Sequence, residues 1–459
     1  MNMSNNISYN ELVIKFANVN GSGSASANTF CAKSLYRMGI PISAKNVFPS
    51  NIQGLPTWYE ITVSESGKLA RKEKMDVMIA MNAQTYKTDI EAVNVGGTFI
   101  YDNSIKRQFS RNDIRVIGIP IARLCAQEYS DARQRQLFKN IVYLGSLSLL
   151  IGIDLDVIEK LLSEQFKSKK NLLEANFKAL SIGRKYVQEN IAYPLETQVR
   201  KCNKNINKIM INGNEAAALG ALYGGATVAS WYPITPSTSL VEAFEKHANK
   251  LRKISTGELN VAVIQAEDEL SAIGMAIGAN WNGSRAFTAT SGPGISLMGE
   301  FLGLAYFAEI PLVLFDIQRG GPSTGMPTRT QQSDLITCAY ASHGDTKQIL
   351  LLPSDPHECF EFGYKSFDLA EQLQTPIMVL SDLDIGMNDW VVDELNEGSD
   401  AGSAAGVLLG PLLGLWVKEV VSPKLVHHLL LRDSKLLGVE LGKGGEGEGP
   451  SVPVFTPAS

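Results

Sequence analysis

Strand-like apolar runs alternate with helix-like runs of very small side chains between residues 208 and 392. The strand-like runs are GELNVAVIQAE, SRAFTATSGPG, IPLVLFDIQRGG and TPIMVLSDLDIG. The helix-like runs include NEAAALGALYGGATV and DELSAIGMAIGANWNG, which consist largely of alanine, glycine and other small residues. This alternation predicts an α/β domain. Helices with such small side chains also predict close packing against another element or another chain.

A second alternating segment covers about residues 10–195. It begins with the strand-like ELVIKFANV, the loop NGSGSAS and the amphipathic helix ANTFCAKSLYRMGI, which ends near Gly39. Further strand-like runs are PTWYEITVS, MDVMIAM, GTFIYD and DIRVIGIP, and residues 156–190 are charged and helical in pattern. The pattern predicts another α/β domain. The stretch YPLETQVRKCNKNINKIMIN is interpreted as a basic linker between the two domains.

The composition changes at about Gly398. From there to the end the sequence contains no Ile, Asn, Gln, Met, Tyr or Cys, and it closes with the low-complexity run GKGGEGEGPSVPVFTPAS. Residues 398–459 are therefore expected to form an atypical, disordered tail. Two interpretations stay open: a native flexible tail, or a foreign or out-of-frame sequence joined to a truncated enzyme.

Charge and cysteine content exclude several classes of function. The 459 residues carry a formal net charge of -5, so neither nucleic acid nor an anionic membrane is expected as a partner. The polar beginning MNMSNNISYN lacks the apolar core of a secretory signal, and the cytoplasm is the expected location. Five scattered cysteines without a CxxC motif predict neither an iron–sulfur cluster nor a structural zinc site in this chain.

Several loops could carry chemistry, and each also has a structural interpretation. GSGSAS could bind a dinucleotide at a helix N-terminus, or it could be a turn that packs helix on strand. Glu267, Asp268 and Glu269 could interact only with a helix dipole, or one of them could transfer protons. Arg319, in RGGPSTGMPTRTQQSD, could be solvated, or it could bind a carboxylate in a bidentate manner.

Four motifs taken together resemble one protein family. They are GNEAAALGALYGGATVASWYPITPSTS, AEDELSAIGMAIGA, TSGPGISLM and RGGPSTGMPTRTQQSD. In this order they resemble the alpha subunit of the 2-oxoacid:ferredoxin oxidoreductases. The N-terminal VNGSGSASANTFCAKSLYRMGIPISAKNVFPSNIQGLPTWYE and MDVMIAMNAQTY resemble the gamma domain that is fused in front in the 2-oxoglutarate type. The resemblance covers about residues 11–392.

The resemblance implies a fold and a reaction. Residues 1–200 would form a Rossmann-like gamma domain, and residues 208–392 an α/β domain that binds the pyrimidine of thiamine diphosphate. The implied reaction is the CoA-dependent oxidative decarboxylation of 2-oxoglutarate to succinyl-CoA and CO2, a tricarboxylic acid cycle step, with reduction of ferredoxin. The implied partner is a beta subunit that shares the thiamine diphosphate and carries Mg2+ and the iron–sulfur cluster. Consistent with this division, the sequence contains no GDG motif for a diphosphate-bound metal.

The resemblance also assigns residues. Glu269 matches the glutamate that protonates the aminopyrimidine ring, with Glu267 as the competing choice. Thr235 matches a threonine that faces cofactor and substrate, and Arg319 matches the arginine for the substrate carboxylate. The remaining assigned positions are Thr328, Ser50, Asn51 and Gln53 for substrate and Ser291 and Gly292 for cofactor.

Two departures from the family pattern leave alternatives open. Gln53 stands where several relatives have arginine, so pyruvate or another 2-oxoacid is an alternative substrate. The family usually continues beyond DLDIGMNDW with a further α/β domain, which the tail replaces. A truncated, inactive subunit and an NAD-dependent dehydrogenase that uses GSGSAS are therefore the remaining alternatives.

Overall fold

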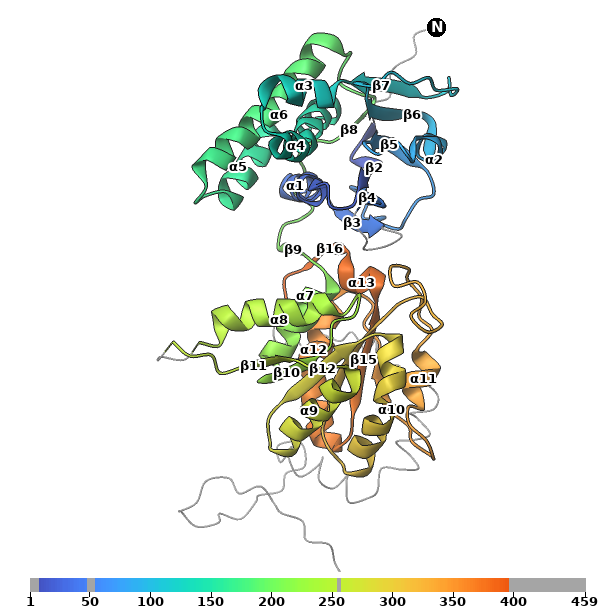
Figure 1. The fold of residues 1–459 in the computed structure, drawn as a ribbon, viewed down its shortest axis with the longest axis vertical. Coiled ribbons are helices and arrows are strands. Elements are labelled where there is room, and N and C mark those ends of the chain that lie inside the picture. Colours follow the sequence, from blue (N-terminus) through green and yellow to red (C-terminus); the bar gives the residue numbers. More distant parts are fainter. Residues whose placement is uncertain (1–7, 48–53, 254–256, 396–459) are drawn as a thin grey trace, which may run out of the picture. The chain divides into compact units, whose positions relative to one another are not determined.

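An eight-stranded sheet organises the first part of the chain (Figure 1). The computed structural model describes residues 8–47, 54–253 and 257–395. The sheet order is β7-β6-β5-β2-β4-β3-β16-β9, with β2, β5, β6 and β7 parallel and β4, β3, β16 and β9 joined by antiparallel pairs. These strands, with the short pair β1 and β8, are β1 (Ser8–Tyr9), β2 (Glu11–Val19), β3 (Ile42–Val47), β4 (Pro56–Ser64), β5 (Met75–Ala80), β6 (Val93–Asp102), β7 (Arg115–Ile119), β8 (Thr197–Gln198), β9 (Lys208–Ile211) and β16 (Asp389–Asp393).

Alternating side chains of this sheet build two cores. Leu12, Ile14 and Phe16 of β2 face the core beneath the longer helices, whereas Val13 and Ala17 face the short helix α2. Figure 1 shows the longer helices on one side of the sheet and α2 on the other. The helices are α1 (Ser24–Arg37), α2 (Tyr86–Glu91), α3 (Ile121–Glu128), α4 (Ala132–Ile151), α5 (Leu155–Gln165) and α6 (Lys170–Asn190). We call this sheet and these helices the first lobe.

The sheet extends beyond the segment that sequence patterns assigned to it. β9 lies at the end of the stretch interpreted as a linker, and β16 comes from the end of the second domain. β16 pairs with β3 on one side and with β9 on the other, both in antiparallel register. The linker interpretation was therefore wrong for residues 208–211, which are an edge strand of the first lobe's sheet. β3 was also missed as a strand.

A six-stranded parallel sheet forms the second lobe, residues 212–388, in the order β11-β10-β12-β13-β15-β14. Its strands are β10 (Val228–Trp231), β11 (Ala262–Gln265), β12 (Ala286–Thr290), β13 (Val313–Gln318), β14 (Ile349–Leu351) and β15 (Ile377–Asp382). Its helices are α7 (Gly213–Tyr223), α8 (Thr238–Leu251), α9 (Glu269–Trp281), α10 (Gly292–Phe307), α11 (Leu335–Ala339), α12 (Pro356–Leu373) and α13 (Leu383–Met387). The prediction of two α/β units is confirmed.

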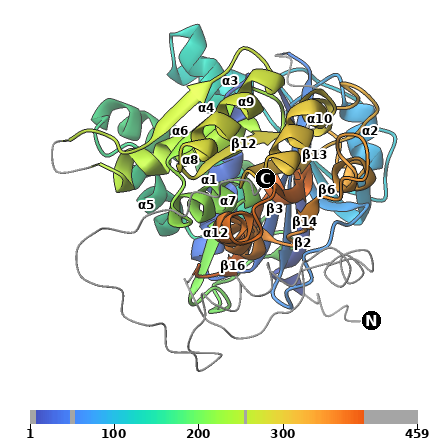
Figure 2. The same cartoon turned by 90° about the horizontal axis from the view of Figure 1, so that it is seen from below.

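The small-residue helices pack as their composition predicts. A Cβ on Gly220 of α7 would lie 2.2 Å from the carbonyl oxygen of Phe360 on α12, so these two helix backbones can approach only because the residue is glycine. On the other face of the sheet, α9 and α10 run side by side (Figures 1 and 2). Within the described residues, no helix is both long and apolar enough to span a bilayer.

Candidate functional site

The order in which strands are added to the second sheet reverses between β10 and β12. From β10 the chain crosses to β11 at one edge and then returns to β12 on the opposite side of β10. In parallel sheets, ligands bind outside the carboxyl ends of the strands at such a switch point. Thr235 follows β10, Glu269 follows β11, Ser291 follows β12 and Arg319 follows β13. The topology therefore brings these sequence-assigned positions to one edge of one sheet.

Most hydroxyl groups of the turn after β10 form hydrogen bonds within the turn or to α7. Ser237 and Thr238 donate to the carbonyl oxygen of Ile234 at 3.0 and 3.2 Å. Asn214 of α7 donates to the carbonyl of Pro236 at 2.9 Å and to the Ser239 hydroxyl at 2.8 Å. Each of these bonds stiffens the turn, and together they fix the half-buried Thr235, whose hydroxyl has no hydrogen-bond partner among the described residues.

Glu269 and Glu267 differ in their surroundings. Asp268 caps α9 by accepting the backbone N–H of Ser271 at 2.7 Å, so the dipole role belongs to this neighbour. Glu269, the first residue of the helix, is only 7% exposed, whereas Glu267 is exposed. A Cβ on Gly294 of α10 would come within 3.0 Å of Glu269 Cγ. No hydrogen bond or ion pair reaches the Glu269 carboxylate from the described residues, which is unusual for a buried acid.

Arg319 is buried without an acidic partner. Its Nη1 donates to the carbonyl oxygen of Thr235 at 2.6 Å, and its Nη2 donates to that of Thr324 at 3.0 Å. Among the described residues, its buried Nε has no hydrogen-bond partner and no carboxylate lies within ion-pair distance. Burial lowers the pKa of Arg319, and the charges of Asp334 and Glu269 oppose this effect. A buried cation of this kind is prepared for an anionic ligand.

The other assigned positions of the second lobe lie around the same edge. Ser291 is the N-cap residue of α10, yet its buried hydroxyl does not cap the helix and has no hydrogen-bond partner in residues 8–47, 54–253 and 257–395. A Cβ on Gly292 would lie 2.8 Å from Asp334 Oδ1. Thr328, in the Arg319 loop, is 6% exposed. Ser50, Asn51 and Gln53 lie outside the described residues, so their assignment stays a prediction.

Two carboxyl groups beside Arg319 received no role from the sequence. Asp316 on β13 is fully buried and shares a hydrogen bond with Asp334, which begins α11 as its N-cap residue. Burial raises the pKa of Asp316 well above its usual value, and the Asp334 charge adds to this. A proton on Asp316 would let it donate to Asp334, and Cys338 Sγ donates to Asp316 Oδ2 at 3.6 Å. The sequence signal that could have identified Asp316 is an aspartate inside the apolar run VLFDIQ.

We expect Asp316→Asn to remove a pH-dependent loss of stability. Because the folded pKa is raised, the contribution of Asp316 is complete below its unfolded pKa and is lost as pH rises through the folded pKa. Asparagine keeps the donor and the acceptor without titrating. The stability of the variant relative to the wild type should therefore rise between pH 5 and pH 9, by about 1–3 kcal/mol. Urea unfolding across this range measures the difference, and a constant difference would contradict the protonated state.

The GSGSAS loop lies against α4. Asn140 donates to the carbonyl of Ser22 at 2.9 Å, and Gly23, the N-cap residue of α1, lies next to the Leu137 side chain. These contacts support the interpretation of the loop as a turn that packs helix on strand. They give no support to the dinucleotide alternative.

Two family models match the chain. Residues 13–186 match the model described as pyruvate ferredoxin/flavodoxin oxidoreductase. Residues 219–392 match the thiamine diphosphate-binding model of pyruvate flavodoxin/ferredoxin oxidoreductase. The second match includes Thr235, Glu269, Ser291, Arg319 and Thr328.

Relatives with curated descriptions extend the match. The chain is 30% identical to subunit alpha of 2-oxoacid:ferredoxin oxidoreductase 1 from Aeropyrum pernix over 84% of its own length and 68% of that protein. It is 47% identical over 176 residues to the 2-oxoglutarate synthase subunit KorA of Methanothermobacter marburgensis, which covers 38% of this chain and 45% of that protein. The chain spans 63% of the length of several curated relatives that it matches.

One solved structure is similar over most of the chain. It is 2-oxoglutarate:ferredoxin oxidoreductase from Magnetococcus marinus, determined with 2-oxoglutarate, coenzyme A and succinyl-CoA bound. The TM-score is 0.75 at 30% sequence identity, over 84% of this chain and 66% of that one. The fold of both lobes is therefore the fold of this class of enzyme.

Proposed function

The chain belongs to the alpha subunits of the 2-oxoacid:ferredoxin oxidoreductases, and from this premise we propose that it catalyses, with a partner, the oxidative decarboxylation of 2-oxoglutarate. CoA is the co-substrate, succinyl-CoA and CO2 are the products, and ferredoxin accepts the electrons. The 2-oxoglutarate synthase subunit and the Magnetococcus marinus enzyme among its relatives support this substrate. The proposal places the reaction in the tricarboxylic acid cycle and in the cytoplasm.

The observation that carries this proposal is the state of Arg319. Two carbonyl oxygens hold this buried guanidinium, and within the described part of the chain its Nε has no partner and no acid forms an ion pair with it. Such a cation needs an anionic ligand to balance its charge. A 2-oxoacid supplies a planar carboxylate that fits the fork of an arginine. Thr328, buried in the same loop, provides a further hydroxyl near this carboxylate in our proposal.

The described residues fit one end of thiamine diphosphate. The Glu269 carboxylate and the Ser291 hydroxyl, which have no hydrogen-bond partner among the described residues, follow β11 and β12 at one sheet edge. Side chains at positions 292 and 294 would be too close to Asp334 and Thr290, and both positions are glycine. When bound, thiamine diphosphate supplies the nucleophilic carbon and the electron sink that decarboxylation requires. Glu269 would hold a proton at the pyrimidine ring nitrogen, and Thr235 would face the thiazolium and the substrate. Ser291 and Gly292 would line the cofactor.

A partner subunit completes the proposed site. The sequence lacks a GDG motif and clustered cysteines, so we assign Mg2+, the diphosphate and the iron–sulfur cluster to the beta subunit. An exposed apolar surface on α9 and α10 supports such a partner. Trp281 is 62% exposed and Phe307 is 89% exposed. The other members of this surface are Leu270, Met275, Leu297 and Leu304.

The proposal keeps two domains. Residues 1–200 are proposed as the gamma domain and residues 208–392 as the pyrimidine-binding domain, although β9 and β16, at the two ends of the second range, pair in the sheet of the first lobe. The gamma-domain residues Ser50, Asn51 and Gln53 are proposed to lie near the substrate and the CoA entrance. Residues 398–459 are outside this account.

A substrate panel tests the proposed function. The chain is co-expressed with the beta subunit from its own genome, and the complex is assayed with CoA, thiamine diphosphate, Mg2+ and a viologen dye. We expect 2-oxoglutarate to have the highest kcat/KM, by about tenfold or more over pyruvate and over branched or aromatic 2-oxoacids. If 2-oxoglutarate is the slowest substrate, the substrate assignment is wrong.

Two further outcomes of this panel would support the alternatives. Failure of the assembled complex to turn over any 2-oxoacid would support the truncated, inactive subunit. Tight NAD binding by the full chain, measured as a shift of its melting temperature, would support the dehydrogenase alternative.

A further inference from the structure

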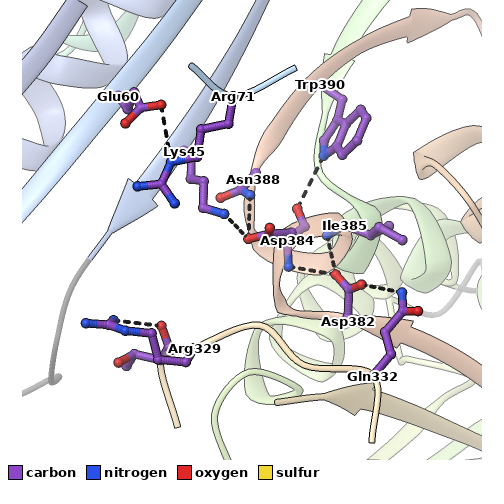
Figure 3. Close-up of polar contacts among 11 residues, drawn as sticks. Lys45, Glu60, Arg71, Arg329, Gln332, Asp382, Asp384, Ile385, Asn388 and Trp390 are labelled. Carbon is purple, nitrogen blue, oxygen red and sulfur yellow. Dashed lines mark hydrogen bonds and ion pairs between the residues drawn. The ribbon is translucent and has the colours of Figure 1, made fainter. Parts of the chain in front are cut away.

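Two aspartates in the first turn of α13 bind the loop that carries Arg319. Asp382 caps this helix, because its Oδ1 accepts the backbone N–H groups of Asp384 at 2.8 Å and Ile385 at 3.0 Å. Its Oδ2 accepts the side-chain N–H of Gln332 at 2.7 Å. Figure 3 shows Gln332 reaching from the loop to this carboxylate. One acid thus fixes the end of α13 and the end of the loop together.

Asp384 holds the same loop two residues earlier and reaches a different sheet. Its carboxylate accepts a hydrogen bond from the Thr330 side chain. It also forms an ion pair with Lys45 of β3, which Figure 3 shows. Asn388 adds a longer bond at 3.4 Å. Burial pushes the pKa of Asp384 upward, but the bonds from Lys45 and Thr330 outweigh it and hold the pKa below its usual value. Asp384 is therefore charged at neutral pH.

These contacts matter because the loop has little internal support. Residues 322–326 are exposed, and its internal backbone bonds join Gly320, Met326 and Arg329. Asp382 lies 50 residues from Gln332 in the sequence. It comes close to the loop because β13 pairs with β15, which places Gln318 opposite Asp382. The side chain of Gln318 also accepts the backbone N–H of Asp334 at 3.1 Å. Because Arg319 Nη2 donates to the carbonyl of Thr324 in this loop, the way in which β15 and α13 hold the loop bears on the guanidinium as well as on Thr328.

Lys45 extends the network into the first lobe. On neighbouring strands it stands opposite Glu60, and Glu60 stands opposite Lys15. Glu60 lies 3.6 Å from Lys15 and 3.7 Å from Arg71 in ion pairs. A row of alternating charges therefore runs across β2, β4 and β3 and ends at Asp384. β3 is also the strand that leads in sequence to residues 48–53.

We propose that Asp382 and Asp384 are positioning residues for Arg319, and that the Lys45–Asp384 ion pair couples the gamma-domain sheet to the substrate loop. This inference rests on the proposed function, because the loop is a substrate loop only if Arg319 binds a 2-oxoacid. Asp384 sets the loop's position, and Lys45 makes that position depend on the first lobe. Neither residue needs to touch substrate.

The first test separates positioning from general stability. In the assembled complex, Asp384→Asn and Lys45→Met should each raise the KM for 2-oxoglutarate about tenfold, with the CoA KM and kcat changed less than about twofold. The matched control is Arg37→Met, which breaks an ion pair between α1 and Glu164 of α5 that is remote from the loop. A merely structural role would lower kcat and thermal stability without a selective rise in one KM.

The second test is a double-variant cycle. Because both side chains are proposed to act through one ion pair, the double variant Lys45→Met with Asp384→Asn should have a KM for 2-oxoglutarate within about threefold of either single variant. An unchanged KM in both single variants, or a double variant as defective as the sum of the singles, would overturn the proposed coupling. This test requires a wild-type complex that turns over 2-oxoglutarate. If the wild-type complex has no activity, the result contradicts the proposed function and not the proposed coupling.

The third test needs no activity. Hydrogen–deuterium exchange of the full chain should be about tenfold faster at the amides of Gly320, Met326 and Arg329 in Asp384→Asn and in Asp382→Asn than in the wild type or Arg37→Met. Equal exchange in all four proteins would show that the two aspartates do not hold the loop.

Discussion

Replacing Arg319 by methionine is expected to raise the KM for 2-oxoglutarate about 100-fold in the assembled complex. The guanidinium is the one buried cation at this sheet edge among the described residues, and two carbonyl oxygens already fix its orientation. A hundredfold change corresponds to about 2.7 kcal/mol, within the range for truncating one member of a buried charge pair. Steady-state kinetics with 2-oxoglutarate as the varied substrate measures the change.

Two control variants isolate the role of Arg319. Arg329→Met removes an exposed arginine from the same loop and should change the KM less than twofold. Arg319→Lys keeps the charge but loses the bidentate fork, so an intermediate rise of about tenfold is expected. If Arg319→Met lowers thermal stability but leaves the KM unchanged, the guanidinium only holds the turns of Thr235 and Thr324 together.

Glu269→Gln is expected to lower kcat by about 10²–10⁴-fold while the chain folds normally. The carboxylate has no hydrogen-bond or ion-pair partner among the described residues, so the amide disturbs no native contact. What the amide removes is the ability to hold a proton for the pyrimidine ring. Single-turnover kinetics with saturating thiamine diphosphate measures the effect, and circular dichroism checks the fold.

Glu267→Gln is the matched control for this prediction. Glu267 was the competing choice for the same role, it lies two residues earlier and it is exposed. It should retain at least half of the wild-type kcat. If Glu267→Gln were inactive and Glu269→Gln active, the assignment would move to Glu267, and near-wild-type turnover of both would exclude the helix α9 terminus from proton transfer.

Local patterns predicted much of the fold. The run ELVIKFANV coincides with β2 and PTWYEITVS with β4, because short apolar runs rich in β-branched and aromatic residues favour buried strands. The small-residue run after Asp268 became α9, with the aspartate as its cap. The parallel order then placed Thr235, Glu269, Ser291 and Arg319 at one edge of one sheet.

Features that depend on pairing between distant residues could not be predicted from the sequence. β3 contains Lys45 and Asn46, so its pattern does not indicate a strand, and it is one because β4 and β16 flank it. The Asp316–Asp334 pair and the Lys45–Asp384 pair join residues far apart in the chain or in different sheets. A single sequence gives no direct signal for such contacts, although an acid after a buried strand, as in SDLDIG, indicates a helix cap.

The pairing of β9 with β16 has a consequence for how the chain assembles. The two strands form an antiparallel ribbon whose turn is the entire second lobe. Closing so long a loop costs conformational entropy until the intervening segment has become compact. We therefore expect the second lobe to fold before the ribbon closes. The edge of the first sheet that holds β3 would then be the last part of the described chain to be completed.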